Sequence, residues 1–437
     1  MAQMVKLDAG PARTGRVGLA VSLVSLGSIA FEVALTRYFT VASWAEYGYW
    51  VISIAMVGLA LSGVVLALFR TFFLSHFNVF FVVLPLALAG LMTAGFHAAT
   101  FIPFNPIELQ NPFLWKRQLG YVGLYYVALS PSFFCAGLFV GLSFTALRRH
   151  ITTLYAADLM GAGIGAVLML PAMALVHPFY LVAVVVGALA LVPLANAAMA
   201  AGRGRFGLAG CTVLVLICCE ASLVWWNHAS MFEYKDAYPL LMMPENKVRD
   251  TIKSPRGYDL VLDNFTERRD LPLTNNLSLL GAEPPPRAYG LYRDGSRVTS
   301  LIAAEFTTDS SYVQGALSTL PYLMRPVDTV LLIGTDGGFR LAEVQPLKVR
   351  AIVGLESDAT VRRRLTGHTP QDVQLVGDAP QSFLARTRQT FDLIDTGDDF
   401  LQGINGGTFG LTVEGIELQL DLLHKLAACE HVFDATL

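Results

Sequence analysis

The sequence has 437 residues, of which 54% are hydrophobic and only 15% are charged. Because soluble domains usually carry about 25% charged residues, this composition excludes an ordinary soluble enzyme. The formal net charge of -3 and the lack of any Lys/Arg block exclude a typical nucleic-acid binder. We therefore expect the lipid bilayer, and no nucleic acid, to be the partner of this chain.

Apolar runs fill residues 1–230, and we interpret this region as a transmembrane helical domain. Each run has about 18 to 27 residues, long enough for a helix to cross a hydrocarbon core of about 30 Å. Pro131 in the fourth run predicts a tilted or kinked helix. The runs predict about seven spans, near Val17–Leu35, Gly48–Phe69, Phe77–Phe96, Gly120–Leu147, Leu154–Val176, Phe179–Met199 and Leu208–Trp226.

The basic residues beside these spans predict the orientation in the membrane. About eight Lys and Arg lie on one side against about four on the other, which favours a cytoplasmic N-terminus and a plasma (inner) membrane location. An odd number of spans would then put the polar half on the outer face, where nucleosidic cofactors are scarce. Either the count is wrong by one or the polar half uses no such cofactor, and both readings stay open. The more basic side holds Lys6, Arg13, Arg16, Arg70, Arg148, Arg149, Arg203 and Arg205, and the other side holds Arg37, Lys116, Arg117 and Lys235.

Three acids, Glu32, Asp158 and Glu220, fall within or beside the apolar runs. An ionisable group in the bilayer costs about 2.5–3.5 kcal/mol on insertion scales, so it normally faces the bundle interior or water. Glu32 and Glu220 lie near span ends, where an interfacial position explains them. Asp158 precedes Gly161 and Gly165, a spacing typical of close helix contact. We expect Asp158 to point into the bundle, with packing or an ion relay as its alternative roles.

Cysteine usage predicts neither disulfides nor a metal site. Four of the five cysteines fall in the apolar runs, and only Cys429 lies in the polar half. No C-x-x-C spacing with partner histidines occurs, so we expect no metal.

The polar half divides into a linker with a small β unit, residues 231–310, and a Rossmann-like domain, residues 311–437. Glu283–Arg287 reads as a linker or stiff turn, and alternation in Leu301–Phe306 predicts strands. After a helix-like run, Ser311–Leu323, strands and helices alternate as in a doubly wound, methyltransferase-type parallel sheet. The expected strands are Val330–Ile333, Ala351–Leu355, Gln374–Ala379 and Phe391–Asp395.

A glycine loop follows the first of these strands directly. It contains Gly334, Asp336, Gly337 and Gly338, and the next strand ends on Glu356, about 20 residues on. In nucleotide-binding units such glycines let the backbone approach the ligand, and the acid accepts hydrogen bonds from the ribose hydroxyls. This spacing predicts a nucleoside site.

Two further acids follow the other strands, Asp378 and Asp395. Ligands of open α/β sheets bind outside the carboxyl ends of the strands, so these acids, Gly334 and Glu356 are predicted to surround one crevice. The alternative is that the acids are solvated turn residues.

Together these residues resemble the membrane-attached branch of the spermidine synthase-like (polyamine aminopropyltransferase-like) family. The resemblance covers most of the chain. It rests on Ala30–Thr36, Tyr155–Gly165, Asp294-Gly295, Asp309, Tyr312, Leu320-Pro321, the glycine loop, Glu356, Gly377–Ala379 and Phe391–Ile394.

The resemblance implies an aminopropyl- or methyl-transfer fold. It places a donor, decarboxylated S-adenosylmethionine or S-adenosylmethionine, on the loop of Gly334, Asp336 and Gly338. The ribose would bind Glu356 and the adenine would lie near Asp378. Asp395 and Tyr312 would be the catalytic residues, acting on a polyamine or another amine.

Several positions depart from the family pattern. Asp336 stands in the middle of the glycine loop, and Gly397 occupies the position of the family's catalytic acid, with Asp398 and Asp399 just after it. Ser310 and Val313 replace an acid and a histidine near Tyr312. The sequence also reaches Leu437 without the final strand pair of the family sheet, which predicts an incomplete sheet.

Two hypotheses remain from the sequence. One is a membrane-anchored, spermidine synthase-like transferase with degraded catalytic motifs. The other is a transporter-like or scaffolding membrane protein whose polar half is a catalytically inactive domain. The sequence leaves room for a homo-oligomer in both cases.

Overall fold

The structure is a computed structural model of the 437-residue chain, and it divides into two compact units. The first, the helical unit, comprises Met1–Glu233 with Lys253–Tyr258, and the second, the polar unit, comprises Tyr234–Ile252 with Asp259–Leu437. The structure describes residues 11–43, 47–198, 205–269, 287–302, 312–313, 319–365, 373–397 and 412–423, without the side chains of 11–13, 197–198 and 205–208.

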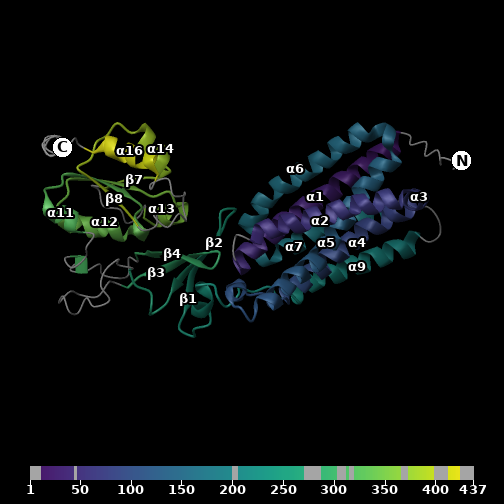
Figure 1. Cartoon of the computed structure of the whole chain (residues 1–437), viewed down its shortest axis with the longest axis horizontal. Helices are drawn as coiled ribbons and strands as arrows, with labels where there is room; N and C mark the ends of the chain where they lie inside the picture. The colour runs from purple at the N-terminus through teal and green to yellow at the C-terminus, as the bar shows by residue number, and fades with distance from the viewer. Residues whose placement is uncertain are drawn as a thin grey trace. The chain divides into compact units, whose positions relative to one another are not determined.

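Long apolar helices build the helical unit (Figure 1). Six helical segments in the described residues are long and apolar enough to cross a membrane, which makes the chain a multi-pass membrane protein by length and composition. The elements are α1 (Pro11–Ala42), α2 (Tyr47–Leu68), α3 (Arg70–Ser75), α4 (Phe77–Thr100), η1 (Pro106–Gln110), α5 (Trp115–Ala146), η2 (Arg148–His150), α6 (Ile151–Leu175), η3 (Pro178–Tyr180), α7 (Leu181–Leu189), α8 (Leu191–Ala198) and α9 (Arg205–Trp225).

The six segments coincide with the first six expected spans, and the sixth is built from η3, α7 and α8. The seventh expected span falls on α9, whose apolar part, Ala209–Trp225, is shorter than the others. It packs against α4, α7 and α8 and runs alongside α4 in Figure 1. The count of about seven spans therefore stays a prediction that depends on α9.

Reporter fusions test the span list directly. A fusion after Arg149, in η2, and one after Gly204, just before α9, are expected to report the same membrane face. The reason is that two crossings, by α6 and by the segment of α7 and α8, separate the two points. Opposite faces for the two fusions would show that the span list is wrong.

The contact between α1 and α6 is the most extensive helix pair of the unit. A Cβ on Gly161 would lie 2.0 Å from the Ser22 carbonyl oxygen, and one on Gly165 would lie 2.5 Å from that of Leu26. Only the absence of side chains lets the two backbones approach this closely. The Ser25 hydroxyl of α1 donates a hydrogen bond to the half-buried Asp158. As predicted, both glycines lie at a helix contact, and Asp158 faces α1.

The polar unit contains an antiparallel sheet in the order β1-β2-β3-β4. Its strands are β1 (Lys247–Lys253), β2 (Tyr258–Asp263), β3 (Tyr289–Arg293) and β4 (Ser296–Leu301). Asp294 and Gly295 form the turn between β3 and β4, both with positive φ. The small β unit is thus confirmed, but it is larger than expected, because β1 and β2 arise from a stretch read only as polar linker. Of the expected strand Leu301–Phe306, residues 303–306 lie outside the described residues.

A second sheet of four parallel strands forms the core of the polar unit, in the order β7-β6-β5-β8. This confirms the expected α/β fold class. Valine, leucine and isoleucine fill β5, which is fully buried from Val330 to Ile333, as a strand covered on both faces requires. The elements are α11 (Leu320–Met324), β5 (Thr329–Ile333), η7 (Asp336–Gly338), α12 (Phe339–Val344), η8 (Gln345–Leu347), β6 (Ala351–Leu355), α13 (Ala359–Leu365), β7 (Val373–Val376), α14 (Pro380–Arg386), β8 (Leu393–Thr396) and α16 (Val413–Leu422).

Three expected elements have other boundaries in the structure. The strand expected over Gln374–Ala379 is observed as β7, Val373–Val376, because Ala379 already caps α14. The last strand begins at Leu393 rather than Phe391, because Phe391 instead forms an isolated bridge with Leu423. The helix expected over Ser311–Leu323 is observed only as α11, and Ser311 and residues 314–318 lie outside the described residues. The Glu283–Pro286 part of the expected linker also lies outside them.

Candidate functional site

The strand order reverses between β5 and β8, which is where open α/β sheets have a crevice at the carboxyl ends of their strands. From β5 the chain moves outward through β6 to β7 and then returns to β8 on the other side of β5. Ligands of such sheets bind at this reversal, outside the carboxyl ends of the strands. The predicted site residues lie at those ends: Gly334 follows β5, Glu356 follows β6 and Asp378 follows β7 after one intervening residue. Asp395 is the penultimate residue of β8.

The outer acids of this edge are far apart. Neighbouring strands are about 4.8 Å apart, so β7 and β8, three spacings from each other, lie roughly 14 Å apart. Asp378 and Asp395 therefore cannot hold the same small group. An extended ligand such as a nucleoside with a side arm matches this width.

The glycine loop has the backbone conformation that its sequence predicts. Gly334, Gly337 and Gly338 have φ values of 86°, 65° and 100°, a region that L side chains rarely adopt. A Cβ on Gly337 would lie 1.7 Å from the Ser300 carbonyl oxygen of β4. The Ile302 amide also donates to the Gly337 carbonyl at 3.0 Å. The small sheet therefore packs directly on the loop and fixes its shape.

Glu356 is buried and already hydrogen-bonded within the protein. Its Oε2 accepts a hydrogen bond from the Thr335 hydroxyl at 2.5 Å, and its Oε1 accepts one from the Asp358 amide at 2.9 Å. Burial removes the carboxylate from water and raises its pKa to about 7, although the Thr335 hydrogen bond acts in the opposite direction. A hydrogen bond with the Thr335 backbone lowers the pKa as well, so the partners of this carboxylate among the described residues are neutral donors.

Asp336 does not face solvent; it is buried and paired with Arg269. The Arg269 Nη2 lies 3.0 Å from Asp336 Oδ2, and its Nε lies 3.0 Å from Glu343 Oε1. The Tyr312 hydroxyl donates to the same Glu343 oxygen at 2.8 Å. Burial lowers the pKa of Arg269, but the Glu343 and Asp336 carboxylates raise it by more. The net pKa lies above its ordinary value, so Arg269 stays charged. Tyr312 is thus a buried partner of Glu343.

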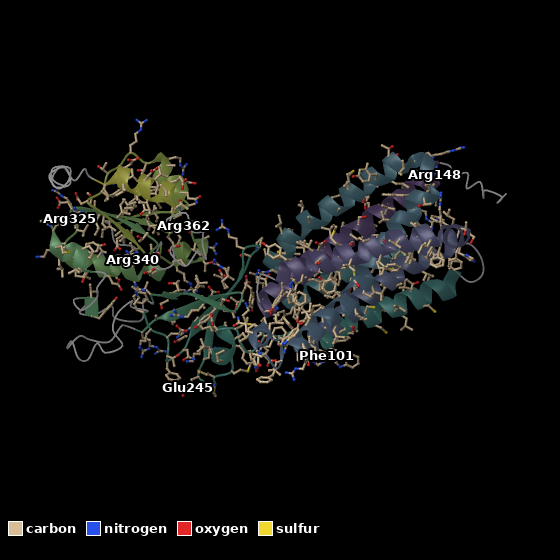
Figure 2. All side chains as sticks on the ribbon, viewed as in Figure 1. Phe101, Arg148, Glu245, Arg325, Arg340 and Arg362 are labelled. Carbon is tan, nitrogen blue, oxygen red and sulfur yellow. The ribbon has the colours of Figure 1, made fainter. Side chains whose placement is uncertain are left out.

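Asp395 is paired with a second buried arginine, Arg340, which is labelled in Figure 2. Arg340 Nη2 contacts Asp395 Oδ1, and the Tyr322 hydroxyl donates to Asp395 Oδ2 at 2.7 Å. Burial and the Asp395 carboxylate raise the pKa of Tyr322, so it remains a donor. Both oxygens of the predicted catalytic acid therefore already accept a hydrogen bond from the protein.

One side of the cluster has unused hydrogen-bonding atoms. Asp336 Oδ1 and Arg340 Nη1 are buried and have no hydrogen-bond partner among the described residues. Both lie 2.8 Å from the point at which a Cβ of Gly397 would stand. A larger side chain at residue 397 would meet both atoms, so glycine is the residue that fits beside these ion pairs.

Asp378 lies at the exposed edge of the sheet. Its carboxylate pairs with Arg386 at 2.6 Å, and both side chains are about half or more exposed. Nearby, Arg362 donates to the Glu356 carbonyl at 2.9 Å and to the Gly377 carbonyl at 3.3 Å, which ties the ends of β6 and β7 together. Arg362 is labelled in Figure 2.

The sequence prediction missed Arg269, Arg340, Glu343 and Tyr322. The spacing of Arg340 four residues after Asp336 was a visible signal, because residues four apart on a helix are neighbours. Arg269 lies 67 residues before Asp336, and no local pattern predicts that contact. Asp398, Asp399 and Ser310, also singled out from the sequence, lie outside the described residues.

Metal binding has no support in the described ranges, where no group of three or more His, Cys, Asp or Glu side chains could hold an ion. No protein-family model matches the chain. No curated protein matches it in sequence either.

Proposed function

We propose that the polar unit is a membrane-attached, spermidine synthase-like domain that binds an S-adenosyl-type nucleoside without transferring an aminopropyl group efficiently to an amine. The observation that carries the proposal is the buried cluster of Arg269 and Arg340 with Asp336, Glu343 and Asp395. The protein's own guanidiniums occupy the carboxylates that a polyamine would need.

Charge favours the donor over the acceptor. In the cluster two guanidiniums face three carboxylates, so the described residues leave one carboxylate in excess. S-adenosylmethionine has a net charge of about +1, because its own carboxylate offsets its ammonium group, and the one excess carboxylate can balance the remaining sulfonium. The decarboxylated form lacks that carboxylate, so charge favours S-adenosylmethionine of the two donors. A polyamine brings two or more ammonium groups, each of which needs its own acceptors in a buried site.

The surroundings of Asp395 also argue against aminopropyl transfer to an amine. A general base must approach the attacking amine within about 2.6–3.2 Å. At Asp395 an amine would have to share the carboxylate with the Arg340 guanidinium and the Tyr322 hydroxyl, both of which already bind it. Glu356, by contrast, is bound by neutral donors and by no guanidinium among the described residues, so its charge is left for ribose hydroxyls.

Nucleoside affinity is expected to depend on Glu356 and on pH. The carboxyl group is mostly protonated below its pKa of about 7 and ionised above it, and the ribose hydroxyls donate to the ionised form. Affinity for labelled S-adenosylmethionine or its decarboxylated form should therefore rise about tenfold from pH 6 to pH 8. Glu356→Gln should weaken binding at pH 8 by roughly tenfold and remove the pH dependence, because charge-assisted bonds contribute about 1.5–3 kcal/mol.

Equilibrium dialysis of the full-length protein in detergent measures these affinities, with Glu245→Gln, an exposed acid, as the control. Product formation from putrescine should be weak or absent. Robust turnover abolished by Asp395→Asn would contradict the inactive acceptor site. Binding unchanged in Glu356→Gln would contradict the nucleoside site and leave a transporter-like or scaffolding membrane protein as the remaining function.

A further inference from the structure

A groove opens at one end of the helical unit, between α2, α5 and the start of α6. Its volume is about 440 Å³. Arg148 lies at this end of the bundle, opposite the end that carries Phe101 (Figure 2). The residues that line it include Gly63, Leu66, Ala67, Arg70, Phe144 and Arg148.

Two arginines give the groove a positive mouth. Arg70 begins α3 and Arg148 begins η2, and both side chains are exposed. None of the lining residues is acidic, and neither arginine forms an ion pair within the part of the chain that the structure describes. Both guanidiniums are therefore available to an external anion.

Apart from Thr145, whose hydroxyl donates to the Gly141 carbonyl, the wall of the groove is apolar and belongs to helices long and apolar enough to span a membrane. Leu66 and Ala67 come from the last turn of α2, and Phe144 comes from the last turn of α5. Gly63 adds no side chain, and a Cβ there would meet nothing within 4 Å. The groove thus combines a cationic mouth at the level of the span ends with an apolar floor that continues toward the bilayer.

We infer that this groove binds an anionic phospholipid, with the phosphate on Arg70 and Arg148 and an acyl chain along Leu66, Ala67 and Phe144. Guanidinium groups bind phosphate oxygens in a bidentate manner, which suits a phosphodiester at the membrane surface. Basic pockets between transmembrane helices on the cytoplasmic side are suited to anionic head groups. The same end of the bundle carries the excess of basic residues that predicts a cytoplasmic face.

A soluble phosphate would use the mouth but not the apolar floor. An acyl chain is therefore what distinguishes the lipid from a free anion. It also predicts that affinity depends on both parts of the groove.

Native mass spectrometry and thermal unfolding of the full-length protein, with phosphatidylglycerol or phosphatidylcholine added, test the inference. We expect phosphatidylglycerol to bind more tightly, and Arg70→Gln and Arg148→Gln each to lower its affinity roughly fivefold. Arg149→Gln is the matched control, because Arg149 is an exposed neighbour in η2 that does not line the groove. Phe144→Ala should weaken phosphatidylglycerol but leave glycerol phosphate binding unchanged.

Equal affinity for the two lipids, or an equal loss in Arg149→Gln, would overturn the site. Displacement of the lipid by equimolar inorganic phosphate would show that a free anion is the ligand instead. Neither result depends on nucleoside binding by the polar unit.

Discussion

Replacing Arg269 with methionine is expected to lower the free energy of unfolding of the polar unit by about 3–5 kcal/mol. The substitution removes the cation that pairs with Asp336 and Glu343, both of which are buried. Glu343 would then lie in a low-dielectric interior without a guanidinium partner, and Asp336 would keep only Arg340, at 4.0 Å. Removing one partner of a buried pair costs more than the pair itself contributes. Urea unfolding of the full-length protein, followed by hydrogen exchange in β5 and β6, measures the loss.

Arg268→Met is the matched control. Arg268 precedes Arg269 but is exposed, and among the described residues its side chain donates to the Phe265 and Glu267 carbonyls, not to a carboxylate. We expect its effect to stay within about 0.5 kcal/mol. Adding Asp336→Asn to Arg269→Met should recover part of the stability, because it removes one buried charge. A loss below about 1 kcal/mol in Arg269→Met would show that the ion pairs are solvated and that the cluster does not fill the acceptor site.

The second large effect is expected in the helical unit, where Gly161→Val should separate α1 from α6. A Cβ at residue 161 would stand 2.0 Å from the Ser22 carbonyl oxygen, which belongs to the backbone and cannot rotate away. The two helices must move apart or shift, and overpacking of this kind costs about 1–3 kcal/mol or more. The midpoint of thermal unfolding in detergent should fall accordingly.

Gly163→Val provides the control on the same helix. Gly163 is exposed, and a Cβ there meets nothing within 4 Å. The two variants have the same composition and the same intrinsic helix propensity, so only the contact with α1 distinguishes them. Equal midpoints for the two variants would show that α1 and α6 do not pack through Gly161.

The elements that the sequence predicted best are those with a strong local pattern. The six long apolar segments and the buried strand β5 were predictable from length and composition, whereas the six-residue helix α3 was not predicted. Strand β1 was missed because it is largely exposed and polar, so its residues carry no clear alternation. Strand β2 is buried throughout, but Asp259 and Asp263 limit its apolar run to Leu260–Leu262. Its place in the sheet comes from pairing with distant strands, which a single sequence does not reveal.

Of the candidate site, the sequence predicted the glycine loop and the acids at the strand ends, but not the partners of those acids. The glycine loop and Glu356 follow from spacing along the chain, and the structure places them at neighbouring strand ends. The partners of the acids were not predictable, since Arg269 and Asp395 reach the cluster from separate segments of the fold. An acid near a glycine loop has the same sequence signature whether it faces a ligand or a buried arginine. Burial and pairing distinguish these cases, and both are tertiary properties.

The partnership of α1 with α6 also determines the order in which the membrane half can assemble. Helix α1 is the first described helix to leave the ribosome, yet α6 begins about 110 residues after α1 ends, at Ile151. At about 5–20 residues per second, synthesis of this interval takes on the order of ten seconds. During that time the surface of α1 that carries Ser22 and Ser25 has no α6 to cover it. The bundle therefore closes late in biosynthesis, and a nascent chain that stops before α6 leaves its first helix without its main partner.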